Sequence, residues 1–237
     1  MSITWKALRR LSRLSHAGVV LAALNQPTAL GVLYGGTDKV KHGYMPVYAN
    51  HLGGRRFERN LVFEIGVGGY GDRRPGGSLA IWRDYFVRSR VVGIDLHDKD
   101  VHLGHRVSFQ QADQSSEADL RSVVDRHGPP DIVIDDGSHI GEHVLASFRF
   151  LFPLLRPGGI YVIEDLSTSY DPERGGGDPP PEATAVGLLQ GLVNCAQSED
   201  PTFLVRPDWG PAPKAPPYPG VKSVHVYPGI AVVNKVA

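Results

Sequence analysis

Acidic and histidine side chains follow two short apolar runs in the sequence. Asp136 and His139 come after one run, and Glu164 and Asp165 come after another. Three carboxylates held close together repel one another and raise each other's pKa unless a cation lies among them. Ligand sets made only of oxygen suit a hard ion such as Mg²⁺, with Mn²⁺ or Ca²⁺ as alternatives. We therefore predict that Asp136, Glu164 and Asp165 bind a metal ion.

His139 follows Asp136 within a short turn, and a histidine is well suited to take a proton from a substrate hydroxyl near neutral pH. A metal ion on the same oxygen would lower the pKa of that hydroxyl. We predict that His139 is the general base; the alternative is a turn residue whose ring bonds to the backbone. The segment His139–His143 also matches H-x-x-E-H, an inverted zinc-peptidase pattern. That pattern must lie wholly on one helix, which Gly141 disfavours, so a zinc hydrolase is the weaker interpretation.

Three glycines follow an earlier apolar run. Gly66, Gly68 and Gly71 have the spacing G-x-G-x-x-G that is typical of dinucleotide sites, and Asp95 lies about where such sites hold a ribose. An NAD-dependent oxidoreductase is therefore one candidate function. A dinucleotide site, however, needs a helix that begins inside the motif. Here residues 72–77 intervene, and Ser78 is the better N-cap of the next helix.

Glu64, directly before the first glycine, favours a cationic cofactor over a diphosphate. S-adenosylmethionine carries a sulfonium and an amino group and no phosphate. The glycine turn would approach its amino-acid part, Asp95 would bind its ribose hydroxyls, and Asp113 or Gln114 would contact its adenine edge. The alternative is that these residues only cap helices and form turns. The predicted cofactor-binding residues are Glu64, Gly66, Gly68, Ser78, Asp95, Asp113, Gln114 and Asp135, of which Asp135 could instead bind the histidine.

Short apolar strands alternate with helical stretches along the middle of the chain. This alternation predicts an α/β fold with a doubly wound, mostly parallel sheet covered on both faces. In such sheets ligands bind beyond the carboxyl ends of the strands, where the acidic residues lie. The segment 223–233 predicts a closing antiparallel hairpin around Pro228-Gly229. The expected strands are 61–65, 90–95, 107–113, 131–136 and 160–165, and the expected helices are 79–86, 117–127 and 142–155.

The segments outside this alternation suggest two further features. Residues 1–60 are expected to form helices joined by a break at Gly35-Gly36, before a cofactor-binding domain over 61–237. The first 14 residues have the spacing of an amphipathic helix, which we favour over a secretory signal. The Gly/Pro-rich segment 169–181 is expected to be a mobile loop that covers the site as a lid.

Composition excludes several classes of protein. The chain has 237 residues with 25 basic and 25 acidic side chains, so no broad electrostatic argument favours a nucleic acid or an anionic membrane as partner. The single cysteine, Cys195, excludes an internal disulfide and a multi-cysteine metal cluster. No apolar run approaches the roughly 20 residues that span a bilayer. We expect a cytoplasmic protein.

Three segments together resemble the metal-dependent sugar O-methyltransferases. They are Phe63–Tyr70, Ile134–His139 and Arg156–Asp165, and the acidic and histidine motifs in the last two are the specific ones. The macrolide-sugar enzymes of the mycinamicin and tylosin pathways are the most similar, and mycobacterial enzymes that methylate mannose polysaccharides are also similar. Thr37-Asp38-Lys39, followed by His42, Tyr44 and Tyr48, looks like a further shared segment.

This resemblance implies a class I methyltransferase fold that binds S-adenosylmethionine and Mg²⁺. It maps the metal ligands onto Asp136, Glu164 and Asp165 and the catalytic histidine onto His139. The implied reaction is methyl transfer to a hydroxyl of a saccharide, either a mannose oligosaccharide or a glycosylated natural product, with the substrate hydroxyls chelating the ion. The loop residues Tyr170 and Arg174 would shape the choice of acceptor. Homo-oligomers are common in the family and are expected here, and the remaining alternative is a non-catalytic protein that binds S-adenosylmethionine.

Overall fold

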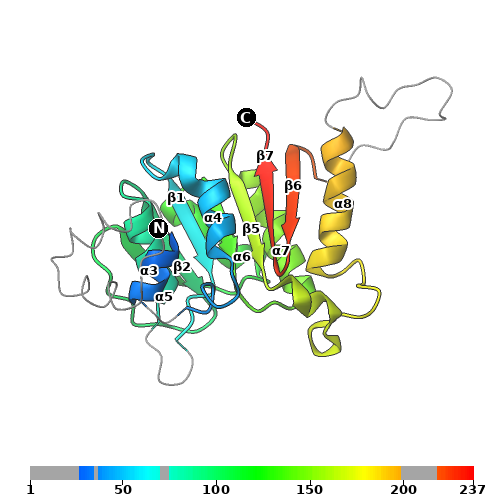
Figure 1. The fold of residues 1–237 in the computed structure, drawn as a ribbon, viewed down its shortest axis with the longest axis horizontal. Coiled ribbons are helices and arrows are strands. Elements are labelled where there is room, and N and C mark those ends of the chain that lie inside the picture. The colour runs from blue at the N-terminus through cyan, green and yellow to red at the C-terminus, as the bar shows by residue number, and fades with distance from the viewer. Residues whose placement is uncertain (1–26, 35–36, 70–74, 199–217) are drawn as a thin grey trace, which may run out of the picture. The chain divides into compact units, whose positions relative to one another are not determined.

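The structure is a computed structural model that describes residues 27–34, 37–69, 75–198 and 218–237 (Figure 1). The chain divides into two compact units, Met1–Gln111 and Ala112–Ala237. The amphipathic helix predicted for the first 14 residues lies outside the described residues, and so does Gly71. The predicted domain boundary at residue 60 stays a prediction.

The first unit contains three parallel strands in the order β3-β2-β1. All five residues of β1 are buried, as expected for a parallel strand with both faces covered. Helix α5 packs against β2, and α3 packs against both α4 and α5. The elements of this unit are α3 (Pro27–Tyr34), α4 (Met45–Leu52), η1 (Gly53–Arg55), β1 (Leu61–Ile65), α5 (Gly77–Tyr85), β2 (Arg90–Asp95) and β3 (Val107–Gln111).

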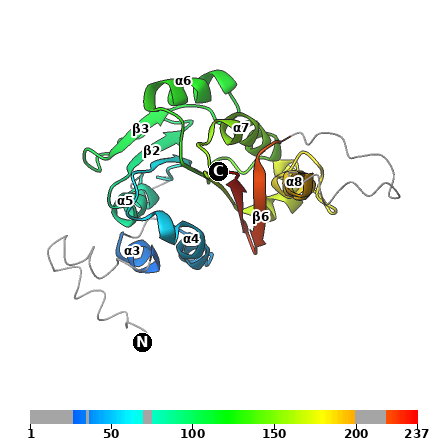
Figure 2. The same ribbon diagram turned by 90° about the horizontal axis from the view of Figure 1, so that it is seen from above.

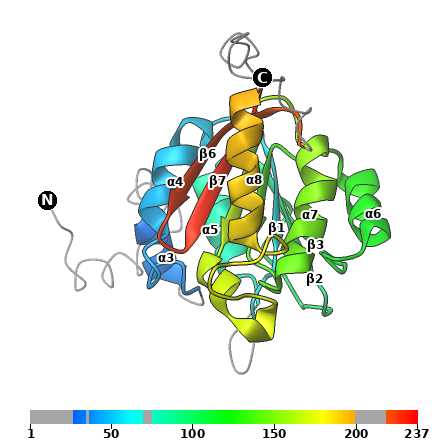
Figure 3. The same ribbon diagram turned by 90° about the vertical axis from the view of Figure 1, so that its right-hand side faces the viewer.

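The second unit contains four strands in the order β4-β5-β7-β6. Strands β4 and β5 are parallel, whereas β7 runs antiparallel to both β5 and β6. Helix α8 lies beside β6, and α6 lies beside α7 (Figures 2 and 3). The elements are α6 (Glu117–His127), β4 (Ile132–Asp135), α7 (Gly141–Leu154), β5 (Ile160–Glu164), η2 (Leu166–Tyr170), η3 (Pro172–Arg174), α8 (Ala185–Ser198), β6 (Val221–Tyr227) and β7 (Ile230–Lys235).

Helix α6 shows how local sequence sets the limits of an element. The Ser116 hydroxyl accepts a hydrogen bond from the backbone N–H of Asp119 at 3.2 Å, which satisfies one of the free donors of the first turn. Glu117 and Asp119 place negative charge at the same end, where the helix dipole favours it. Gly128 ends the helix with φ 96°. The prediction of 117–127 is therefore confirmed residue for residue.

Helix α7 is held at its C-terminal end by strand β7. The Lys235 ammonium donates to the backbone carbonyls of Pro153 at 2.6 Å and Leu155 at 2.7 Å. These carbonyls lie in and beside the last turn of α7, where the chain offers no helical donor. Lys235 therefore joins the last strand of the unit to the end of a helix.

The structure confirms the five predicted strands and the hairpin, with shifted limits. Strand β3 ends at Gln111, so Asp113 lies beyond it, and β4 and β5 end one residue earlier than expected. The prediction that Ser78 is the N-cap of α5 is wrong. Gly76, with φ 82°, takes that position, because the glycine turn needs a left-handed residue there.

The Gly/Pro-rich segment after β5 contains regular structure. It includes the last residues of η2 and all of η3, and backbone hydrogen bonds run from Gly176 to Asp171 at 2.8 Å and from Gly177 to Ser169 at 3.0 Å. Its role as a lid stays a prediction.

Within the described ranges, no helix combines the length and apolar character needed to cross a membrane.

Candidate active-site residues

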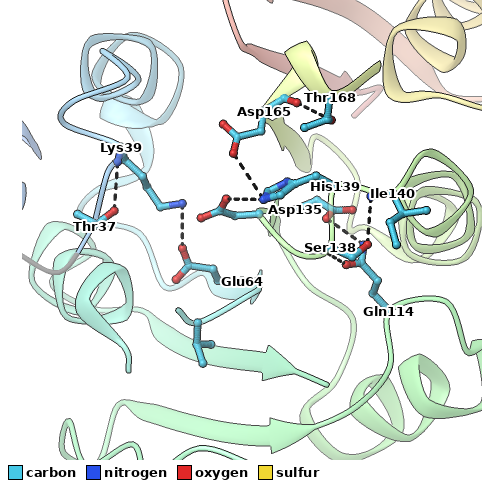
Figure 4. A network of polar contacts seen from close by, with 12 residues as sticks. Thr37, Lys39, Glu64, Gln114, Asp135, Ser138, His139, Ile140, Asp165 and Thr168 are labelled. Atoms are coloured by element: carbon cyan, nitrogen blue, oxygen red, sulfur yellow. Dashed lines mark hydrogen bonds and ion pairs between the residues drawn. The ribbon is translucent and has the colours of Figure 1, made fainter. Parts of the chain in front are cut away.

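A group of three side chains lies at the carboxyl ends of β4 and β5. One ligand atom from each of Asp136, His139 and Asp165 lies within 4.8 Å of the other two. The His139 Nε2 atom is 3.8 Å from Asp136 Oδ1 and 3.5 Å from Asp165 Oδ2 (Figure 4). Because β4 and β5 are parallel neighbours, their carboxyl ends bring together residues from two distant parts of the chain. We call this set the acid–histidine group.

The backbone of this group is strained. His139 has φ 57° and Asp165 has φ 54°, and no other non-glycine residue in the described part of the chain has a positive φ in the left-handed region. Such a conformation costs on the order of 1–3 kcal/mol and persists only where surrounding contacts impose it. The two residues that carry the strain are thus two of the three members of the group.

Glu164 was predicted as the third metal ligand, but it is not a member of the acid–histidine group. It is the last residue of β5 and is 4% exposed, whereas the side chains of Asp136 and Asp165 are 21% and 26% exposed. The structure therefore brings together the predicted base and two of the three predicted ligands. Glu164 as a ligand stays a prediction.

The turn before His139 is fixed through Ser138. The backbone N–H of Ser138 donates to Gln114 Oε1 at 2.7 Å, and its carbonyl accepts from Arg174 Nη1 at 3.1 Å. Its hydroxyl accepts from the backbone N–H of Ile140 at 3.2 Å and lies 3.1 Å from His143 Nδ1. Four different contacts therefore converge on the residue that precedes the predicted base.

Asp135 lies beneath this turn and is fully engaged by protein groups. It is buried and accepts hydrogen bonds from Gln114 Nε2 at 3.2 Å, from the Ser147 hydroxyl at 2.5 Å and from the Tyr161 hydroxyl at 3.0 Å. Burial raises the pKa of Asp135, and the hydrogen bonds from Ser147, Tyr161 and Gln114 oppose that shift. The sequence predicted that Asp135 would bind the cofactor or His139. The charge of His139 also opposes the rise in the pKa of Asp135, and both predicted roles stay predictions. Ser147 and Tyr161 carry no local signal that could have revealed them, because they reach Asp135 from α7 and β5.

Both ends of the Gln114 side-chain amide form hydrogen bonds within the protein. Its nitrogen donates to Asp135 and its oxygen accepts from Ser138, and the residue is 6% exposed. Asp113, its neighbour, accepts from the backbone N–H and the hydroxyl of Ser115 at 2.8 and 2.7 Å. These two bonds hold the pKa of Asp113 below its usual value. The prediction that one of them contacts adenine stays a prediction.

In the first unit, Glu64 is paired with a lysine that the sequence did not assign to the site. The Lys39 ammonium lies 3.4 Å from Glu64 Oε1 (Figure 4). The Ser78 hydroxyl donates to Glu64 Oε2 at 3.0 Å. Both charged side chains are at most 1% exposed. A buried carboxylate is costly without a compensating charge, so the pair explains how Glu64 is tolerated. The segment Thr37-Asp38-Lys39 was the signal available in the sequence.

Asp95 connects the glycine turn to the end of β2. Its Oδ2 atom accepts from the backbone N–H of Val67 at 3.2 Å, and its Oδ1 atom accepts from the N–H of His97 at 3.0 Å. Gly66 and Gly68 have φ 84° and 65°, which only glycine adopts without strain. The glycine turn is thus held at the end of β2, and cofactor binding by Gly66, Gly68 and Asp95 stays a prediction. Of the two predicted acceptor residues, Tyr170 is 51% exposed and Arg174 contacts Ser138 and Asp171.

Comparisons with known proteins identify clear relatives, although no protein-family model matches the chain. It is 45% identical over 203 residues to the 8-demethyl-8-alpha-L-rhamnosyl tetracenomycin-C 2'-O-methyltransferase of Streptomyces olivaceus, which covers 84% of this chain and 52% of the relative. It is 41% identical to the demethylmacrocin O-methyltransferase of Streptomyces fradiae, covering 82% of this chain and 49% of the relative. The chain therefore spans about half the length of these curated relatives.

Solved structures agree with the sequence relatives. The MycE methyltransferase of the mycinamycin pathway, in complex with Mg and SAH, matches with TM-score 0.76 and 38% identity over 89% of this chain and 54% of that chain. The same enzyme with Mg, SAH and mycinamycin VI matches with TM-score 0.78 and 34% identity over 100% of this chain and 64% of that chain. The predicted class I methyltransferase fold, mostly parallel with a closing hairpin, is confirmed. This chain is thus a homologue of the O-methyltransferases that act on sugars of glycosylated natural products.

Proposed function

We propose that this protein transfers a methyl group from S-adenosylmethionine to a hydroxyl of a sugar, with the help of a divalent metal ion. The observation that carries the proposal is the acid–histidine group at the ends of β4 and β5. A proton acceptor and two carboxylates in one place are what metal-assisted alkylation of a hydroxyl requires. The homologues over this region are sugar O-methyltransferases, which supports the same reaction.

The residues present fit a hard cation. Asp136 and Asp165 offer carboxylate oxygens from two neighbouring strand ends, and a positive ion between them would offset their mutual repulsion. Oxygen ligands of this kind suit Mg²⁺, and Mn²⁺ is the closest substitute. We propose that Asp136 and Asp165 hold the ion and that the neighbouring Glu164 completes the set. When bound, the ion would lower the pKa of the substrate hydroxyl and orient it.

His139 would then act as the general base. Its Nε2 atom lies 3.8 Å from Asp136 Oδ1 and 3.5 Å from Asp165 Oδ2, beside the groups proposed to hold the ion that orients the hydroxyl. As the proton moves to Nε2, the hydroxyl oxygen forms a bond to the methyl carbon, the carbon–sulfur bond breaks and sulfur keeps the electron pair. The products are a methyl ether and S-adenosylhomocysteine.

The glycine turn, Asp95, Ser78 and Glu64 are proposed to hold the cofactor. Gly66 and Gly68 allow the backbone to approach a ligand closely, and Asp95 fixes that turn at the end of β2. Because Lys39 already pairs with Glu64, we propose that Glu64 contributes an oriented carboxylate rather than an isolated negative charge. S-adenosylmethionine would supply the methyl group.

The acceptor is proposed to be a sugar of a glycosylated natural product, with a mannose oligosaccharide as the alternative. The two curated relatives act, by their names, on a rhamnosyl tetracenomycin and on demethylmacrocin. Tyr170, about half exposed, would contact the acceptor. A cytoplasmic homo-oligomer is the expected form of the protein.

The decisive experiment is a methyl-transfer screen followed by mass spectrometry. The protein is incubated with S-adenosylmethionine and a panel of glycosylated natural products and mannose oligosaccharides, with Mg²⁺ or with EDTA. We expect a methylated sugar with Mg²⁺ and none with EDTA. Full activity in EDTA would remove Asp136, Glu164 and Asp165 from the mechanism. Calorimetry completes the test: tight NADH binding without S-adenosylhomocysteine binding would establish the oxidoreductase alternative instead.

A further inference from the structure

The peptide groups on both sides of Ser138 are held by side chains from elsewhere in the chain. Gln114 accepts from the N–H at 2.7 Å, and Arg174 donates to the carbonyl at 3.1 Å. The next residue is His139, whose φ of 57° costs energy in any non-glycine residue. The surrounding contacts must therefore impose this conformation, and the bonds from Gln114 and Arg174 to Ser138 are among them.

Arg174 reaches this turn from the segment that follows the other strand end. Asp165 directly follows Glu164, the last residue of β5, and η2 and η3 continue from it to Arg174. This segment is braced internally, because Asp171 accepts from the Glu173 backbone N–H at 3.0 Å and from Arg174 Nε at 3.3 Å. Arg174 thus forms a bridge between the chain after β5, which carries Asp165, and the turn after β4, which carries Asp136 and His139.

A second contact between the same two segments is independent of any side chain. A Cβ atom placed on Gly141 would lie 2.1 Å from the Ala183 carbonyl oxygen and 3.0 Å from Thr184 Cα. Gly141 starts α7 directly after the His139 turn, so the chain beyond η3 lies against the beginning of this helix. The segment after β5 therefore meets the His139 turn at two points, Ser138 and Gly141.

We propose that Arg174 is a positioning residue that sets the separation between Asp165 and the Asp136–His139 turn, and so the geometry in which the metal ion is held. The sequence predicted a different role for Arg174, contact with the acceptor sugar. The proposal deepens the proposed function and rests on it in one respect, namely that the acid–histidine group binds a divalent ion. Mutation of a residue that orients a metal ligand without touching the metal typically lowers metal affinity or activity about 10–100-fold.

The test measures metal binding directly in the full chain. Arg174→Gln removes the bridge to Ser138, Arg174→Lys retains a cationic donor, and Arg121→Gln serves as the matched control. Arg121 is an exposed arginine of α6 that pairs with Glu117 at 2.7 Å and whose guanidinium lies 5.0 Å from the centre of the Phe150 ring of α7. Binding of Mn²⁺ is followed by electron paramagnetic resonance, and thermal unfolding confirms that each variant is folded.

We expect Arg174→Gln to weaken Mn²⁺ binding about 10-fold and to lower kcat with little change in the acceptor KM. Arg174→Lys should recover part of the affinity, and Arg121→Gln should match the wild type. Unchanged Mn²⁺ affinity with a raised acceptor KM would overturn the proposal and restore the acceptor-binding role. A wild-type protein that binds no Mn²⁺ would instead overturn the metal part of the proposed function. If Arg174→Gln does not fold, Arg174→Met takes its place as a side chain of similar length with no donor, and Mn²⁺ affinity equal to wild type in that variant would reject the bridge.

Discussion

Two pairs of carboxylates near strand ends, one pair in each unit, have different surroundings. In the first unit, Glu64 and Asp95 are buried and are held by Lys39, by the Ser78 hydroxyl and by backbone N–H groups. In the second unit, Asp136 and Asp165 are about a quarter or less exposed and face an imidazole across a strained turn. An acidic residue after a strand is therefore not evidence of a ligand by itself. What distinguishes the second unit is that two acids and an imidazole converge on one point.

The largest expected effect comes from removing one of the converging acids. Asp165→Asn keeps the size of the side chain, and asparagine tolerates a left-handed backbone well, so the turn should be retained. We expect Mn²⁺ binding to be lost and methyl transfer to fall to its level in EDTA. Because one of two repelling charges is gone, the melting temperature in EDTA should stay the same or rise.

Asp125→Asn, an exposed site on α6, is the control for this change and should behave as the wild type. A variant Asp165→Asn that keeps its metal affinity would show that the second unit resembles the first, with its acids serving structure alone.

Replacing His139 distinguishes a role as general base from a role as metal ligand. His139→Asn suits the positive φ better than alanine and cannot accept the hydroxyl proton. A general base is worth about 10²–10⁴ in rate, so kcat should fall by that factor while affinities for S-adenosylhomocysteine and Mn²⁺ are retained. Discontinuous methyl-transfer assays measure kcat, and calorimetry measures the affinities for S-adenosylhomocysteine and Mn²⁺. Unchanged turnover refutes the base, and lost Mn²⁺ affinity reassigns His139 as a metal ligand.

The buried pair of the first unit gives a smaller effect, on stability. Lys39→Met removes the ammonium from a fully buried carboxylate, which typically costs about 3–5 kcal/mol. Urea denaturation should show this loss, and adding Glu64→Gln should recover much of it, because the remaining group is neutral. If Lys39→Met leaves the stability unchanged, then Glu64 does not depend on Lys39, and the contrast between the two units is weaker than described.

The smallest effect concerns a carboxylate whose described hydrogen bonds come from a neighbouring residue, Ser115. Ser115→Ala deletes one of the two hydrogen bonds that lower the pKa of Asp113. A lowered pKa in the folded state stabilises the protein above the unfolded pKa of about 3.9, and this contribution is lost as the pH falls through the folded value. Wild type and variant should therefore differ slightly in melting temperature near neutral pH and converge in acid. A difference that persists or grows in acid would exclude Asp113 as its source.

The sequence predicted the elements well and the side-chain partners poorly, for a physical reason. Helix α6 is set by a cap, acidic first-turn residues and a terminal glycine, all within one short segment. The pairing of Glu64 with Lys39, and of Gln114 with both Asp135 and Ser138, joins residues far apart in the chain. Such contacts leave no periodic pattern. The strand ends did predict that Asp136 and Asp165 meet, because parallel neighbours must end together.

The bond from Lys235 to the last carbonyls of α7 has a practical consequence for anyone trimming the protein. Helix α7 begins beside the His139 turn, and Lys235 secures its opposite end from the final residue of β7. A shortened version that stops before this lysine would lose the last residue of β7. The carbonyl oxygens of Pro153 and Leu155 would then lack their ammonium donor. Purification tags and truncations should therefore preserve position 235, even though it lies far along the chain from the groups that do the chemistry.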